Sequence, residues 1–154
     1  MSVKLIIIRH GAAVAGADHD SERRLTPEGK VQAAHAAAWV AGRLPGARIL
    51  SSPYRRAVQT AMEVARAQDS RIHETTDLTP DKAPSQIVDS LLDCQHDVVL
   101  VSHLPLVGRL AALLTDGQIY DQPWSTAECW LLEGDLIAPG CMQVASVWYP
   151  GLEY

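Results

Sequence analysis

The run LIIIRHG (5–11) places four apolar residues directly before an arginine, a histidine and a glycine. A short apolar run that ends in turn-forming residues predicts a buried strand of a parallel sheet. In open α/β sheets, ligands bind just beyond the carboxyl ends of the strands. Arg9 and His10 follow such a strand, so we expect a binding site at this point.

The same pattern of strand, polar residues and proline recurs twice. ARILSSP (47–53) and DVVLVSHLP (97–105) are each expected to be a strand followed by a helix. Ser52 is the expected N-cap of one helix, with Pro53 as its first residue, and Pro105 is expected to open the other. Proline is favoured at this place because the first N–H groups of a helix have no helical partner.

Helical spacing and alternating patterns complete the predicted fold. Thr26 is a good N-cap, and Pro27 is a good first residue, for a long alanine-rich helix. Alternation in 126–135 and 141–150 predicts a pair of strands at a sheet edge. Strands that alternate with helices indicate a mostly parallel sheet covered on both faces. We therefore expect an α/β protein, a three-layer α/β/α sandwich with an antiparallel edge, in a single domain over residues 1–154. Its helices are expected at 26–44, 53–68, 83–94 and 105–114.

Composition narrows the possible partners. A net charge of −5 argues against nucleic acid as the main partner. No apolar run is long enough to span a membrane, and Val3–Ile8 is too short for a signal-peptide core and contains Lys4. The three cysteines are scattered, so they indicate neither a disulfide framework nor a zinc site. We expect a cytoplasmic protein without a cofactor, a nucleic-acid partner or a membrane partner.

Three strand ends carry the candidate site. They bring Arg9 with His10, Ser52 with Arg56 one helical turn later, and Ser102 with His103. If these strands are neighbours, two histidines and two arginines converge beside helix N-termini, which favour anions. Arginine binds phosphate oxygens through two parallel N–H groups. The sequence therefore predicts a phosphoryl pocket to which Ser52 also contributes.

Helical phase separates two neighbouring arginines. Successive helix residues turn by about 100°, so Arg55 and Arg56 point in different directions. Ser52, Arg56 and Thr60 are spaced i, i+4 and share one face. Because Ser52 lies at the strand end, Arg56 rather than Arg55 is expected to face the pocket.

Simpler interpretations apply to each residue alone. A histidine at a strand end is usually a hydrogen-bonded loop residue, and an arginine on a helix is usually solvated. Four such residues at equivalent positions make these interpretations weak. A metal site at His10 and His103 would need a third ligand, and neighbouring arginines repel a cation, so an anion is favoured over a metal.

Several segments together resemble one known family. These segments resemble motifs of the histidine phosphatase superfamily, which has a phosphoglycerate mutase-like fold. They occur in the same order as in that family and span most of the chain. The short length and SHLPLVG are most similar to the small bacterial SixA-type phosphohistidine phosphatases. The matching segments are RHG (9–11), RRLTPEG (23–29), SSPYRRAVQTA (51–61), DLTP (77–80) and VSHLPLVGRL (101–110).

The resemblance implies a role for each matching residue. His10 would be the nucleophile that takes the phosphoryl group, Arg9 and Arg56 would hold that group, and His103 would bind or polarise it. Arg23 matches a position that lines the phosphate side of the pocket. One departure from the family is Ala12, because a polar or acidic residue often follows RHG.

These roles imply a phosphatase that forms a phosphohistidine intermediate and needs no metal. A neutral imidazole attacks phosphorus, and water then hydrolyses the intermediate. An alkoxide leaving group needs a general acid, for which Asp77 and Asp81 are the only candidates considered, and a surface role is favoured for both. An imidazole leaves more easily, so the expected substrate is phosphohistidine on a signalling or phosphotransfer protein.

Other functions remain open at this point. The alternative within the fold is a small-molecule phosphomonoesterase, and a mutase is disfavoured because it must retain its intermediate in a closed site. A non-catalytic phosphoprotein-binding module is a further alternative, against which the presence of both His10 and His103 argues.

Overall fold

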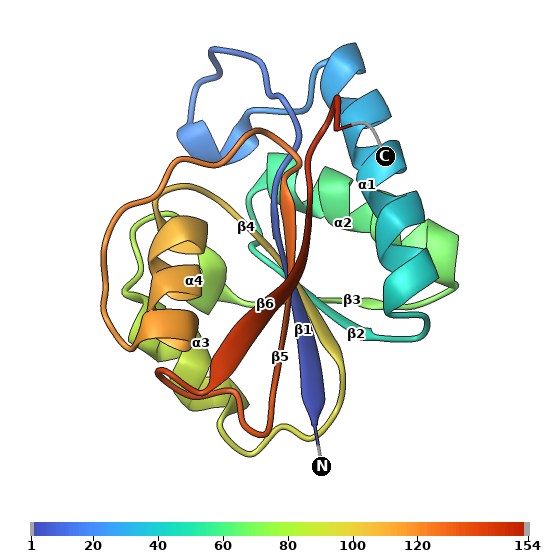
Figure 1. Cartoon of the computed structure of the whole chain (residues 1–154). Coiled ribbons are helices and arrows are strands. Elements are labelled where there is room, and N and C mark those ends of the chain that lie inside the picture. The colour runs from blue at the N-terminus through green and yellow to red at the C-terminus, as the bar shows by residue number, and fades with distance from the viewer. Residues whose placement is uncertain (1, 153–154) are drawn as a thin grey trace.

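The computed structural model describes residues 2–152 as one six-stranded sheet with helices on both faces (Figure 1). The strand order is β3-β2-β4-β1-β5-β6. β1 pairs with β4, and β2 pairs with β4 and β3, all in parallel, whereas β5 is antiparallel to both β1 and β6. The strands are β1 (Val3–Arg9), β2 (Arg48–Ser51), β3 (Ile72–Glu74), β4 (Val98–Ser102), β5 (Cys129–Gly134) and β6 (Met142–Trp148).

Two helices cover each face of the sheet. α1 and α2 lie on one side in Figure 1, and α3 and α4 lie on the other. The expected three-layer sandwich with an antiparallel edge is therefore confirmed. The helices are α1 (Pro27–Arg43), α2 (Arg55–Gln68), α3 (Pro84–Leu91) and α4 (Leu106–Asp116), with short 3-10 turns η1 (Asp20–Glu22) and η2 (Thr76–Leu78).

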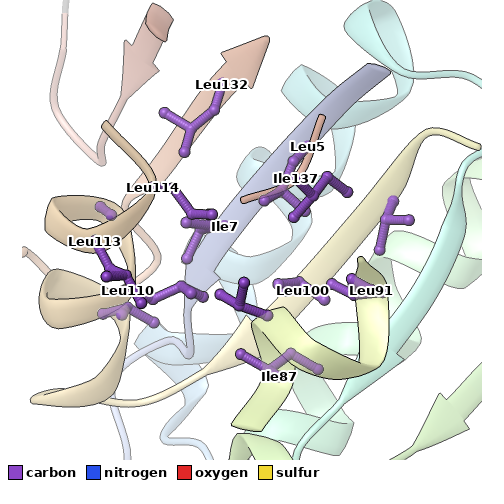
Figure 2. Close-up of a cluster of buried hydrophobic side chains, with 14 of the residues drawn as sticks. Leu5, Ile7, Ile87, Leu91, Leu100, Leu110, Leu113, Leu114, Leu132 and Ile137 are labelled. Atoms are coloured by element: carbon purple, nitrogen blue, oxygen red, sulfur yellow. The ribbon is translucent and has the colours of Figure 1, made fainter. Parts of the chain in front are cut away.

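Alternation along β1 explains the two cores. Ile6 and Ile8 pack among the alanines of α1 and α2. Leu5 and Ile7 point to the opposite core with leucines of α3 and α4, as Figure 2 shows. A continuous apolar run is required because both faces of this strand are buried. Packing on both faces holds β1 in place. It therefore also fixes the position of the carboxyl end of this strand.

The starts of two helices differ from expectation. α2 begins at Arg55 with Tyr54 as its N-cap, so Ser52 is not the N-cap and Pro53 is not the first helical residue. Ser52 stays in line with the sheet because its N–H donates to Val101 O at 3.0 Å. α4 begins at Leu106 and has Pro105 at its N-cap.

The start of α1 agrees with expectation. Thr26 is the N-cap, and its hydroxyl accepts a hydrogen bond from Gly29 N at 2.9 Å. Pro27 is the first helical residue. This cap fixes the end of the loop that leads from β1 past the candidate site.

Residues 2–152 contain neither a membrane-spanning helix nor a cluster of metal-binding side chains. No helix in this range is long and apolar enough to cross a membrane. Within the same range, no group of three or more His, Cys, Asp or Glu side chains is placed to hold a metal ion.

Candidate active site

The three strand ends that carry the candidate residues lie side by side. β4 runs between β1 and β2, and Arg9 is in register with Ser102 while Ser51 is in register with Val101. Beyond the strands, His10 N donates to Ser102 O at 3.0 Å. The parallel sheet therefore brings residues far apart in sequence to one edge.

His10 is buried and has both ring nitrogens engaged. Nδ1 lies 2.7 Å from Gly11 O, and Nε2 lies 3.3 Å from Nε of Arg56. A carbonyl only accepts and a guanidinium only donates, so the proton is on Nδ1 and the lone pair is on Nε2. Burial, together with the charges of nearby arginines, lowers the pKa of His10 to about 4, although the bond to Gly11 opposes this. At neutral pH the ring is uncharged, and its Nε2 lone pair faces Arg56.

His103 is only 1% exposed and lies against His10, with 5.1 Å between the ring centroids. Its Nε2 is 2.8 Å from Ser52 Oγ, and its Nδ1 is buried with no hydrogen-bond partner in the described part of the chain. Burial, and then the neighbouring His10 and Arg56, lower the pKa of His103 to about 2. The imidazole is therefore neutral in the free protein.

Arg56 is buried, whereas Arg55 is exposed. Besides its contact with His10, Arg56 donates from Nη1 to the backbone O of Asp20 at 2.7 Å and from Nη2 to Asp20 Oδ2 at 3.1 Å. Arg23 donates from Nη1 to the other carboxylate oxygen of Asp20, Oδ1, at 3.0 Å. It also donates from Nε to Val14 O. Asp20 thus joins Arg23 to Arg56.

Arg9 is held from the other side of the site. Its Nη1 donates to Trp124 O at 2.6 Å, and its Nε is buried with no partner within residues 2–152. Burial lowers the pKa of Arg9, and the nearby carboxylate of Glu128 opposes that change. Glu128 is itself buried and accepts from Trp130 Nε1 at 2.6 Å. An unpartnered guanidinium N–H beside a neutral histidine is available to an anion.

Two glycines allow the loop after β1 to pack closely against the start of α1. A Cβ on Gly11 would lie 2.5 Å from Gly29 O, and a Cβ on Gly29 would collide with Ala12 O. Gly11 N also donates to Thr60 Oγ1 at 3.1 Å. Side chains are therefore excluded at both glycines for steric reasons.

Ala12, the departure from the family pattern, is held through its backbone. Its N–H donates to Gln32 Oε1 at 2.9 Å, and its carbonyl accepts from Thr26 N at 2.9 Å. The loop is therefore fixed without a polar side chain at this position.

The structure brings the six expected residues to one place. Direct contacts link His10, Arg56, His103 and Ser52, Asp20 links Arg23 to Arg56, and the positive charge of Arg9 acts on His10. The remaining candidates stand apart: within residues 2–152, neither Asp77 nor Asp81 forms a hydrogen bond or ion pair with any of the six.

Asp20 was missed from the sequence. It lies in DHDSE (18–22), an acidic stretch between two motifs that carry arginines. An acidic run is usually a solvated surface, and Asp20 is indeed half-exposed. Only the folded loop shows that its carboxylate contacts two arginines.

Comparisons with known proteins identify one family. Residues 5–79 match the model of the histidine phosphatase superfamily (branch 1). The phosphohistidine phosphatase SixA of Escherichia coli is 33% identical over 125 residues, covering 75% of this chain and 76% of that protein. A SixA homolog of Haemophilus influenzae is 33% identical over 126 residues, covering 73% and 77%.

A solved structure extends the likeness to the whole fold. The protein histidine phosphatase SixA complexed with tungstate superposes with a TM-score of 0.85 at 30% identity, covering 96% of this chain and 97% of that one. From the motifs, the identity and the fold together, the chain belongs to the histidine phosphatase superfamily.

Proposed function

We propose that this protein is a metal-independent phosphatase that forms a phosphohistidine intermediate on His10 and removes phosphoryl groups from phosphohistidine on a signalling or phosphotransfer protein. The observation that carries the proposal is the state of His10, which is neutral and has its Nε2 lone pair beside Arg56. The names of the SixA relatives support the choice of substrate.

The first step is attack by Nε2 of His10 on phosphorus. Gly11 O keeps the proton on Nδ1, so the ring cannot turn its protonated nitrogen toward the substrate. Arg9 and Arg56 supply positive charge to the phosphoryl oxygens, which is the main requirement in phosphoryl transfer. Two guanidinium groups meet this need with no metal ion.

His103 and Ser52 act together in this proposal. Tyr54 N already donates to Ser52 Oγ at 3.2 Å, so the serine hydroxyl proton is free to bind His103 Nε2. The remaining proton of His103 is then on Nδ1, which has no acceptor within residues 2–152. This neutral N–H is a donor for a phosphoryl oxygen.

The leaving group distinguishes phosphohistidine from ordinary phosphomonoesters. A departing imidazole needs little protonation, whereas a departing alkoxide needs a general acid. In the free protein, Arg23 and Arg56 lower the pKa of Asp20 and hold it ionised, so it enters the reaction with no proton to donate to the first leaving group. Within residues 2–152, Asp77 and Asp81 form no hydrogen bond or ion pair with His10, Arg56 or His103. The site therefore suits a substrate whose leaving group departs without an acid.

The function is tested by competing a phosphohistidine-bearing protein against a panel of phosphomonoesters. We expect the phosphohistidine protein to be dephosphorylated first and alkyl phosphates to react slowly. Rates measured over aryl phosphates should fall steeply as the leaving-group pKa rises, and Asp77→Asn and Asp81→Asn should not change that slope. A shallow slope that steepens in one of these variants would instead indicate a small-molecule phosphomonoesterase.

A further inference from the structure

The carboxylate of Asp20 is half-exposed and contacts two arginines. Arg56 is buried, and Arg23 is partly buried. The Asp20 side chain is 56% exposed, compared with 5% for Arg56 and 29% for Arg23. Of the carboxylates within residues 2–152, it alone hydrogen-bonds to one of His10, Arg9, Arg56 and His103. It therefore faces both the solvent and the place where a phosphoryl group would bind.

The nitrogens of Arg56 show where that place is. Nε and Nη2 lie on the same side of the guanidinium, which is a side that holds two oxygens of one phosphoryl group. In the free protein, Nε donates to His10 Nε2 at 3.3 Å and Nη2 donates to Asp20 Oδ2 at 3.1 Å. A phosphoryl group bound to this side lies next to both the nucleophilic nitrogen and the carboxylate.

The backbone keeps Asp20 nearby when the phosphoryl group enters. Nη2 carries two N–H groups, so a phosphoryl oxygen that takes the one beside Nε shares this nitrogen with the Asp20 carboxylate. The third nitrogen, Nη1, still donates to the backbone O of Asp20 at 2.7 Å. The carboxylate therefore stays close to the phosphoryl group that Arg56 binds.

The carboxylate becomes a better base when the phosphoryl group binds. It then shares Arg56 with a doubly negative neighbour, which favours its protonated form. Its exposed side gives water access and lets the proton pass on to the solvent. These are the properties needed at the face of phosphorus opposite His10.

We propose that Asp20 accepts the proton of the water that hydrolyses the phosphohistidine intermediate, an inference that rests on the proposed function. The water oxygen forms a bond to phosphorus while the bond from phosphorus to His10 Nε2 breaks, and that electron pair returns to Nε2. One water proton moves to the Asp20 carboxylate and then to solvent. Inorganic phosphate leaves, and His10 regains its free lone pair.

The experiment compares Asp20→Asn with the wild type, using para-nitrophenyl phosphate as the probe. Asparagine keeps the shape and the backbone bond but cannot take a proton. We expect a rapid release of about one nitrophenolate per chain, followed by turnover slowed roughly 100-fold, at the lower end of general-base effects. Quenching in alkali should trap phosphate on His10 in the variant.

Glu22→Gln is the matched control. Glu22 is exposed in the same loop, and its side chain makes no hydrogen bond or ion pair within residues 2–152. This variant should keep wild-type turnover and show no accumulated phosphoenzyme. Vanadate binding and circular dichroism should show that both variants fold.

Two results would overturn the role of Asp20. Equal loss of the rapid phase and of turnover would make it a positioning residue for Arg56. Unchanged or faster turnover would make it only a counter-charge that substrate displaces. If the wild type itself neither turned over nor formed phosphohistidine, the proposed function would be wrong, which is a separate outcome.

Discussion

Arg55 and Arg56 differ by one position and have opposite surroundings. Arg56 contacts His10, and Arg55 is exposed. We expect Arg56→Ala to weaken vanadate and phosphate binding by about 100-fold, because a charged hydrogen-bonding pair is worth roughly 1.5–3 kcal/mol or more when buried. Arg55→Ala should change binding less than twofold. Titration calorimetry with both variants checks this, and equal losses would contradict it.

Helical phase was enough to predict which arginine faces the site, although part of the reasoning was wrong. Arg56 and Thr60 do share the buried face of α2, and Thr60 donates to Arg56 O at 2.9 Å. Ser52 is not in the helix. It reaches the same site because it continues β2 and contacts His103. A serine at this position could equally be a helix N-cap or a residue of the site. The sequence alone does not show which of these two roles Ser52 has.

His10 should be indispensable for turnover. His10→Ala removes the Nε2 lone pair, and we expect turnover below detection with the fold retained. His35→Ala is the control, because His35 is exposed on α1. Activity assays and alkaline trapping of phosphohistidine measure the outcome. Normal turnover by His10→Ala would mean that another group takes the phosphoryl group.

At the scale of elements, one contact joins the loop after β1 to the start of α1. Gly29→Ala places a methyl group against the backbone O of Ala12, and neither backbone can give way easily. We expect a loss of about 2 kcal/mol or more in the free energy of unfolding, as is typical of overpacking. Activity should fall too, because the same loop carries Gly11.

Gly42→Ala is the matched control on the same helix. Gly42 is exposed, and an added Cβ meets nothing within 4 Å. Alanine is favoured over glycine in a helix, so this variant should be stabilised by about 0.5–1 kcal/mol. Urea unfolding measures the free energy of unfolding of both variants. A change of the same sign in Gly29→Ala and Gly42→Ala would contradict the steric argument.

Patterns in the sequence predicted the long elements and missed the short ones. α1 is marked by its cap at Thr26 and its alanine-rich run, and β1 is marked by its continuous apolar run. β3 (Ile72–Glu74) was missed because it is an edge strand of three residues, two of them exposed. The turn η1 has no buried residue, so nothing in its pattern marks the position of Asp20. Its place depends on contacts with α2, which are tertiary.

At the scale of the whole molecule, the fold holds two neutral histidines in one buried site. The pKa of His10 is lowered from 6.5 to about 4, and that of His103 from 6.5 to about 2, mainly by burial. The unfolded chain therefore binds more protons than the folded chain below pH 6.5. Stability from this source is fully present above pH 6.5 and is lost as the pH falls toward 4.

We therefore expect the free energy of unfolding to fall between pH 6.5 and pH 4.5, with a slope that approaches about 1.4 kcal/mol per pH unit for each of the two histidines. The lowered pKa of the Asp20 carboxyl keeps its titration below this range. Urea unfolding at several pH values measures the slope, and His103→Gln should reduce it by about half. A flat profile would mean that the two rings bind protons over the same pH range in the folded and in the unfolded chain. Burial would then not hold His10 and His103 neutral below pH 6.5, so the same measurement tests the electrostatics of the site.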